Sequence, residues 1–381
     1  MMNSSLKQFL MDLNQGKNLL VDGVVCSASA YLVEKIAAQA NEKTILLVTS
    51  TPETARQLFD DCEVFFKHEN AKLLRYFPAP DVLPYTQLSP NAIEWAERID
   101  LLFQLRNHKP LIIVAPIAAL LRKLPPRSFI ADVSAIVRVG DEINRENFIE
   151  QLNEYAYEEV ALVETPGSFA KRGAIVDIWP PSKSFPLRIE LEENHIQTIK
   201  EFHPNSQRSR NSKENLQEVQ IPPVREFIFT DKTRQEAIER IHHFADDSNL
   251  PAREHRTLVE NLRAGIAFSG INTFLPAFHS KTETLLDYLP EQSIIITDQA
   301  IDTEDVGQKL FTSVSDLYKN CCSREQIIPA NLLYDNFSDW QLKTFKHQCI
   351  IFNGFAAELP NNNLAKHTLN FSSNADLKKL V

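Results

Sequence analysis

The chain has 381 residues, of which 43% are hydrophobic and 24% charged, and its formal net charge is −10 with a pI near 5.6. This length allows two or three domains with a sizeable core. The acidic balance argues against strong autonomous binding to DNA or anionic membranes, because phosphate contacts need a concentrated cationic surface. The N-terminus is too broken by polar residues for a signal peptide and no apolar run reaches spanning length, so we expect a cytoplasmic protein with no membrane partner.

The first third alternates predicted strands and helices. The apolar run TILLV at 44–48 is typical of a strand buried on both faces of a parallel sheet. Thr51 is positioned to cap the helix that follows it. Further strands are predicted at 18–21, 73–77 and 111–114, and further helices at 29–40 and 92–105. This order indicates an α/β fold with a doubly wound parallel sheet.

In such a sheet the turn after the first strand is where a nucleotide phosphate would bind. A functional loop reads G-x-x-x-x-G-K-[ST], in which the lysine reaches the terminal phosphates and the hydroxyl holds magnesium. Here Gly23 keeps the first position, but Ala28 replaces the second glycine, Ser29 the lysine and Ala30 the hydroxyl residue. The sequence therefore predicts a nucleotide-binding architecture whose chemistry has been lost, with a non-functional loop.

The middle segment changes character between two proline-rich boundaries, LPPR at 124–127 and IPP at 221–223. It contains a predicted helix at 145–157 followed by short strand-like runs separated by polar turns. Residues 128–226 hold 11 Lys and Arg against 17 Asp and Glu, a net charge of −6. We therefore expect a small, acidic α+β insertion, in which any arginine cluster is a local feature.

Two strands in this insertion carry arginines. GSFAKRGAIVDIWP at 167–180 presents Arg172 at a glycine bend, and SFPLRIELE at 184–192 presents Arg188. Strand alternation puts Arg188 and Glu192 on the face opposite the leucines and isoleucine, so Arg188 should be solvated. Taken alone, each arginine is best explained by a cross-strand salt bridge contributing about 0–1 kcal/mol. A recognition surface is the functional alternative.

The last third returns to an α/β rhythm, with helices predicted at 231–245, 253–263 and 306–320 and strands at 293–296 and 349–352. If it completes the first sheet, the middle segment is inserted into one discontinuous domain. The predicted division is 1–127 and 227–357 for the α/β domain, 128–226 for the insertion, and 358–381 for a polar linker. No catalytic motif of the kinds G-x-S-x-G, H-E-x-x-H or G-x-G-x-x-G occurs. We predict no catalytic residue, no metal ligand and no cofactor within this chain.

Several motifs resemble one known family. GSFAKRGAIVDIWPP, FPLRIELE and FHPNSQRS, together with the degenerate loop at 23–30 and the segment RYFPAPDVLPYTQLSPNAIEWAERIDLLFQL, are similar to the UvrB-homology module at the N-terminus of bacterial transcription-repair coupling factors. The similarity extends over nearly the whole chain and is most specific in residues 70–210. The excinuclease component UvrB is also similar, but it carries an intact phosphate loop and an aromatic-rich hairpin where this chain has a short connection near 85–92.

The resemblance implies a degenerate RecA-like domain and an inserted domain that binds the damage-recognition protein UvrA. The family's binding arginines fall on Arg172 and Arg188, and a position often aromatic in the family is Glu192 here. The whole factor also binds RNA polymerase and double-stranded DNA, has an ATP- and magnesium-dependent translocase motor, and masks the UvrA-binding face with a C-terminal domain. Those parts are not visible in the sequence, so the resemblance implies a non-enzymatic N-terminal fragment. The alternatives are a UvrB-type ATPase that processes DNA damage and a DNA-binding module.

Overall fold

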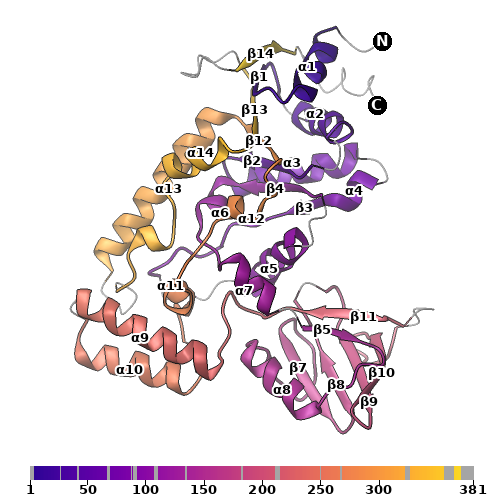
Figure 1. Ribbon diagram of the computed structural model, residues 1–381, viewed down its shortest axis with the longest axis vertical. Helices are drawn as coiled ribbons and strands as arrows, with labels where there is room; N and C mark the ends of the chain where they lie inside the picture. Colours follow the sequence, from indigo (N-terminus) through magenta and orange to yellow (C-terminus); the bar gives the residue numbers. More distant parts are fainter. Residues whose placement is uncertain are drawn as a thin grey trace.

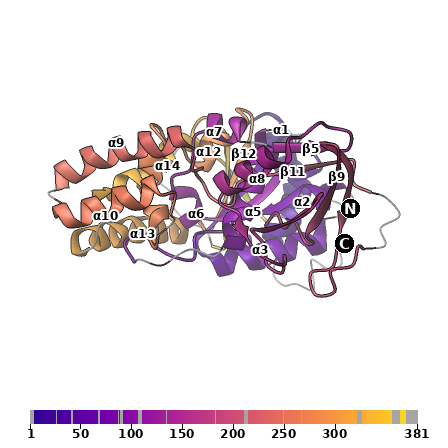
Figure 2. The same cartoon turned by 90° about the horizontal axis from the view of Figure 1, so that it is seen from below.

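A computed structural model describes residues 4–25, 27–40, 43–66, 69–86, 88, 92–106, 110–133, 135–181, 183–210, 215–248, 250–266, 268–321, 327–355 and 364–369. Within these residues the chain forms a parallel sheet, a separate strand-rich lobe and a helical hairpin (Figure 1). The lobe formed by β7–β10 and the hairpin formed by α9 and α10 lie on opposite sides of the molecule in both views, and in Figure 1 both are at the end away from α1 and β14 (Figures 1 and 2). No helix among the described residues is long and apolar enough to span a membrane.

The central sheet interleaves the first and last thirds of the chain. Its order is β14-β1-β13-β12-β2-β4-β3, and the pairings recorded for it are parallel. The strands are β1 (Leu19–Asp22), β2 (Ile45–Thr49), β3 (Leu74–Tyr76), β4 (Ile112–Pro116), β12 (Ile294–Asp298), β13 (Gln348–Asn353) and β14 (Ala365–Thr368). The predicted α/β class with a parallel sheet is therefore confirmed.

One strand was not predicted. β14 lies in the segment 358–381, which the sequence marks as a linker, yet it pairs with β1 as an edge strand. Its short sequence AKHT carries no apolar run, so periodicity gives no signal for it. The rest of the predicted linker, residues 358–363 and 370–381, lies outside the described residues.

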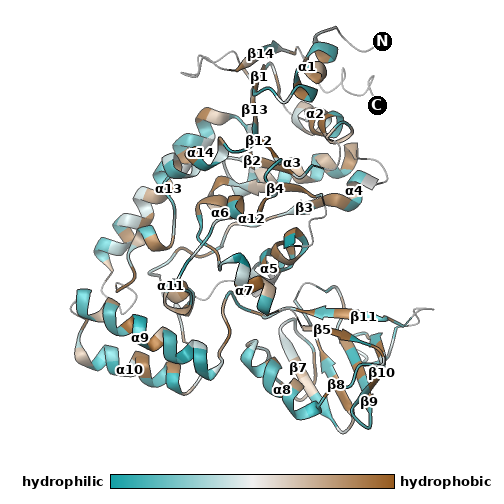
Figure 3. Cartoon of the chain, viewed as in Figure 1, coloured by the Kyte–Doolittle hydropathy of each residue, from teal (hydrophilic) through white to brown (hydrophobic). Residues whose placement is uncertain are grey.

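Helices cover both faces of the sheet. Strand residues that alternate along β2 and β4 enter two cores, one beneath α1–α3 and the other beneath α5, α6, α13 and α14. Figure 3 shows these strands as mainly apolar, whereas α9 and α10 are mainly hydrophilic. The helices are α1 (Ser4–Asn14), α2 (Ala28–Ala37), α3 (Pro52–Phe65), α4 (Glu69–Leu73), α5 (Ala92–Arg106), α6 (Ile117–Leu121), α7 (Arg127–Asp132), α9 (Asp231–Ser248), α10 (Ala252–Arg263), α11 (Leu275–Phe278), α12 (Leu285–Tyr288), α13 (Ala300–Asn320) and α14 (Phe337–Thr344), with 3-10 turns η1 (Ile271–Phe274) and η3 (Ala330–Leu332).

The helix start predicted at Thr51 is confirmed by its cap. The Thr51 hydroxyl accepts a hydrogen bond from the Thr54 backbone N–H at 3.2 Å, and Pro52 occupies the first helical position of α3. Both features satisfy or remove backbone donors that have no partner within the helix. Local sequence therefore fixes where this helix begins.

Residues 135–221 form the strand-rich lobe. It contains β5 (Ala135–Arg138), α8 (Arg145–Glu154), β6 (Glu158–Glu159), β7 (Ser168–Arg172), β8 (Ile175–Ile178), β9 (Leu187–Glu192), β10 (His195–Glu201) and β11 (Glu218–Ile221). One sheet has the order β10-β9-β8-β7-β6, and β5 pairs with β11 in a second. The pairings of β5–β11 among the described residues stay within this segment. The domain boundaries given above stay predictions.

A buried charged pair fixes the return from the lobe to the parallel sheet. Glu226, which follows β11, and Arg98 of α5 are each 1% exposed, with 3.7 Å between the Arg98 Nε and a Glu226 carboxylate oxygen. Burial raises the pKa of Glu226 to about 7, while the charges of Arg98 and Arg122 oppose that rise. Arg98 also donates to the Pro78 carbonyl at 2.7 Å. The pair thus places the connection that leaves the lobe beside α5.

Candidate partner-binding surface

The five-stranded sheet has one buried face and one outer face. Leu187, Ile189 and Leu191 of β9 are buried in the core that includes α8, whereas Arg188 and Glu190 are half-buried on the other face and Glu192 is exposed there. This alternation follows the pattern expected from the sequence. We call the side that carries Arg188, Glu190 and Glu192 the outer face.

Arg188 is mostly shielded from solvent by its partners, so the expectation of a solvated side chain is wrong. Its side chain is 17% exposed and lies opposite Asp177 of β8, whose two carboxylate oxygens accept from the Arg188 Nε at 2.7 Å and Nη2 at 2.8 Å. The guanidinium also lies 4.8 Å from the Phe202 ring centroid and donates to the Gln207 carbonyl at 3.3 Å. The paired carboxylate raises the pKa of Arg188. Bidentate pairing of this kind fixes the guanidinium in the sheet. Arg188 therefore forms the cross-strand salt bridge that was the simpler explanation from the sequence.

Arg172 has a different environment. It is exposed at the end of β7, next to the turn at Gly173 where φ is +56°, and it donates to the Ala161 carbonyl at 3.1 Å. Its neighbour Lys171 points to the opposite face and pairs with Glu159 at 3.0 Å. Strand alternation thus places the adjacent residues Lys171 and Arg172 on opposite faces, and of the two Arg172 belongs to the outer face.

The acidic residues of β9 also differ from each other. Thr198 and Lys200 of β10 donate to Glu190 at 2.6 and 3.2 Å, and the Thr198 hydrogen bond is the main reason that the pKa of Glu190 is lowered. Glu192 is exposed at the end of β9, opposite His195. Glu192 therefore adds a negative charge to the rim of the outer face.

Two loops, one containing Val163 and the other Gln207, cover part of the outer face. The sequence did not predict this covering. Gln207, in a left-handed conformation with φ of +57°, donates through its side chain to the carbonyls of Val163 at 3.2 Å and Pro204 at 2.6 Å. The Val163 side chain is fully buried against Ala170 and Phe202. The loop before β7 and the loop after β10 are thus joined over the sheet. Leu162, in the first of these loops, is 44% exposed.

The predicted phosphate loop is packed into the fold. Gly23 has φ of +82°, as a glycine turn requires, but Ala28 and Ala30 are fully buried. Ser29 is 4% exposed, and its hydroxyl donates to an Asp298 carboxylate oxygen at 2.8 Å. Burial raises the pKa of Asp298 to about 6. The side chain at the lysine position is therefore committed to a contact within the protein.

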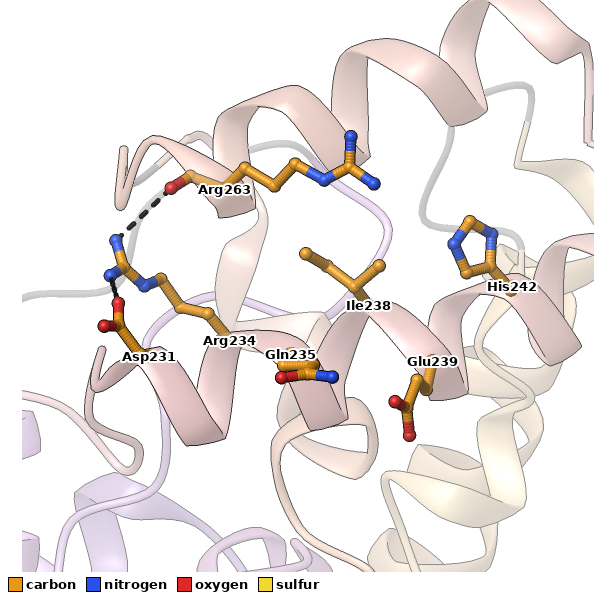
Figure 4. A pocket seen from close by; sticks show the side chains of 7 residues that line it. All are labelled: Asp231, Arg234, Gln235, Ile238, Glu239, His242 and Arg263. Carbon is orange, nitrogen blue, oxygen red and sulfur yellow. Dashed lines mark hydrogen bonds and ion pairs between the residues drawn. The ribbon is translucent and has the colours of Figure 1, made fainter.

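A further hollow lies between α9 and α10, with a volume of about 450 Å³. Figure 4 shows Ile238 pointing between the two helices, while Arg234 is bound by the Asp231 carboxylate and by the Arg263 carbonyl. The hollow contains none of the site residues predicted from the sequence. The side chains that line it include both acidic and basic groups, so the hollow does not favour an anion over a cation.

Comparison with known proteins first defines the class of the lobe. Residues 136–227 match the family described as "UvrB interaction domain". The outer face, with Arg172 exposed and Arg188 paired, lies within these residues.

The wider chain is similar to transcription-repair-coupling factors. It is 28% identical to that of Myxococcus xanthus over 84% of this chain and 27% of the relative. It is 26% identical to that of Bacillus subtilis over 86% and 28%, and 31% identical to that of Rickettsia bellii over 68% and 23%. The predicted resemblance to these factors is confirmed, and the chain spans about a quarter of the length of these relatives.

Proposed function

We propose that this chain is the UvrB-like module of a transcription-repair coupling factor and recruits UvrA to stalled RNA polymerase in transcription-coupled nucleotide excision repair. The observation that carries the proposal is the match of residues 136–227 to the UvrB interaction domain, on the lobe where Arg172 is exposed. Arginine is enriched at interface hot spots because its planar fork pairs with carboxylates. The outer face is the binding surface in this proposal.

The two arginines have separate roles in the proposal. Arg172 contacts UvrA, since it is exposed and, within the part of the chain that the structure describes, one of its five N–H groups donates to the Ala161 carbonyl. Arg188 is a positioning residue, because its guanidinium is occupied by Asp177 and holds the Gln207 carbonyl. Glu192 lies at the rim, where it contributes to partner choice by charge.

The parallel-sheet domain is, in the same proposal, a degenerate RecA-like domain that hydrolyses no ATP. Its support is the occupied environment of Ser29 and Asp298, together with the replaced glycine and hydroxyl positions. The full-length factor is proposed to supply an ATP-driven translocase motor, contacts to double-stranded DNA and RNA polymerase, and a C-terminal domain that masks the outer face.

Isothermal titration of this chain with purified UvrA tests the proposal. Arg172→Ala should weaken binding by about tenfold, as expected for the loss of one charged interface contact. Lys171→Ala is the matched control, because Lys171 is adjacent in sequence but lies on the opposite face of β7, and it should change affinity by less than about twofold. No binding by the unmodified chain would overturn the proposed function.

A further inference from the structure

Leu162 is held in place on both sides. The carbonyl of the preceding residue, Ala161, accepts from Arg172 at 3.1 Å, and the carbonyl of the following residue, Val163, accepts from the Gln207 side chain at 3.2 Å. Two hydrogen bonds from different loops and strands therefore fix the backbone that carries this exposed leucine. A single exposed leucine is common on protein surfaces, so the case for Leu162 depends on the residues that support it.

The support beneath Leu162 extends into the sheet. Val163 is fully buried in a small apolar cluster with Ala170 and Phe202. Arg188, paired with Asp177, donates to the carbonyl of Gln207, whose side chain in turn binds Val163. A backbone held in one conformation before binding loses little entropy when a partner covers the side chain that it carries.

The charged residues of β9 leave few apolar groups for a partner. Glu190 and Glu192 occupy the outer face of that strand. Among the described residues of 135–221, the large apolar side chains exposed to solvent are Leu162, at 44%, and Ile136 of β5, at 46%. Of the two, Leu162 is the one that lies beside the exposed Arg172.

We propose that Leu162 is the apolar anchor of the partner-binding surface. It enters an apolar pocket of the partner protein, while Arg172 pairs with a carboxylate at the edge of that pocket. An apolar anchor next to a charge-assisted contact is the arrangement of an interface hot spot. This inference rests on the proposed function, and it assigns a contact residue outside the two arginine-bearing strands.

Isothermal titration with purified UvrA tests the assignment. Leu162→Ala should weaken binding by about tenfold, and Leu162→Asp by more, because a partly exposed leucine is covered and desolvated only in the complex. Ile136→Ala is the matched control, with nearly the same exposure on a different sheet of the same lobe, and should change affinity by less than about twofold. Circular dichroism spectra should be unchanged for Leu162→Ala and the melting temperature should fall only slightly, since the side chain is partly exposed.

The outcomes separate this inference from the proposed function. If the unmodified chain binds UvrA and Arg172→Ala weakens binding, but Leu162→Ala binds as tightly as the unmodified chain, the anchor assignment is overturned and the proposed function stands. An equal loss of affinity in Ile136→Ala would also overturn it, because the effect would then not be specific to the outer face. No binding by the unmodified chain would overturn both.

Discussion

Asp177→Asn isolates the contribution of the paired Arg188. Asp177 is 1% exposed and accepts two hydrogen bonds from Arg188, whose side chain is 17% exposed. Asparagine has the same shape, but it removes the charge and turns a donor toward the guanidinium. Breaking one side of a buried pair costs about 3–5 kcal/mol. Since Arg188 can still reach solvent and keeps the Phe202 ring, we expect a local destabilisation of about 2–3 kcal/mol.

Hydrogen exchange followed by mass spectrometry is the suitable assay, because it reports on β8 and β9 separately from the rest of the chain. The protection of the β8 and β9 amides against exchange should fall by about 30- to 150-fold, which is the ratio that corresponds to a loss of about 2–3 kcal/mol. Glu190→Gln is the control. Its side chain is 37% exposed and pairs with Lys200 on the same face, so it should change protection by less than about fivefold.

Binding to UvrA then distinguishes a positioning role from direct contact. Asp177 is too buried to touch a partner, yet Asp177→Asn should weaken UvrA binding about as much as Arg188→Ala does. Both changes release the Gln207 carbonyl and, with it, the loop that carries Leu162. If Arg188→Ala weakens binding while Asp177→Asn leaves both protection and affinity unchanged, Arg188 contacts the partner directly and the reasoning is refuted.

Three further predictions concern the parallel-sheet domain. Burial raises the pKa of Asp298 from 3.8 to about 6, so the folded chain binds that proton more tightly than the unfolded chain, and this part of the stability is lost as pH rises through about 6. Asp298→Asn should remove that loss and raise stability at pH 8 by about 2 kcal/mol, measured by denaturant melts at pH 4 and 8; an equal pH dependence in both chains would contradict this. Equilibrium dialysis should detect no binding of ATP with magnesium, and binding that disappears in Ser29→Ala would favour the ATPase alternative. Gly307→Ala should destabilise the chain by about 1–2 kcal/mol in thermal melts, since the new Cβ would lie 2.7 Å from the Phe337 ring, although alanine is the better helix former; Phe337→Leu should restore part of the loss, and an unchanged melting temperature would refute the clash.

Strong local patterns in the sequence were sufficient for the α/β class. The run at 44–48 became β2, the cap at Thr51 began α3, and the segment at 92–105 became α5 with one added residue. Each of these has either a continuous apolar run, a capping residue or helical spacing. β14 was missed because its pairing with β1 is a long-range contact that its own four residues do not signal.

Predictions for the outer face also failed where they depended on contacts between distant residues. Alternation along β9 correctly placed Arg188 on the outer face, but the prediction of a solvated side chain failed because the strand pattern does not show which residue lies opposite. Asp177 sits in an otherwise apolar run of β8, where a buried carboxylate needs a partner. That acid was the one signal in the sequence that could have pointed to the pairing. Leu162 gave no signal, because its position depends on two loops that meet only in the fold.

The order of strands also constrains how the chain folds during synthesis. Leu19 of β1 lies between Ile350 of β13 and Ala365 of β14, so the two strands that pair with β1 are made only when the last third leaves the ribosome. By contrast, β5–β11 find their partners within residues 135–221. Domains generally fold as units as they emerge. A nascent chain that has emerged beyond β11 would thus already display the outer face, while the parallel sheet still lacked β12, β13 and β14.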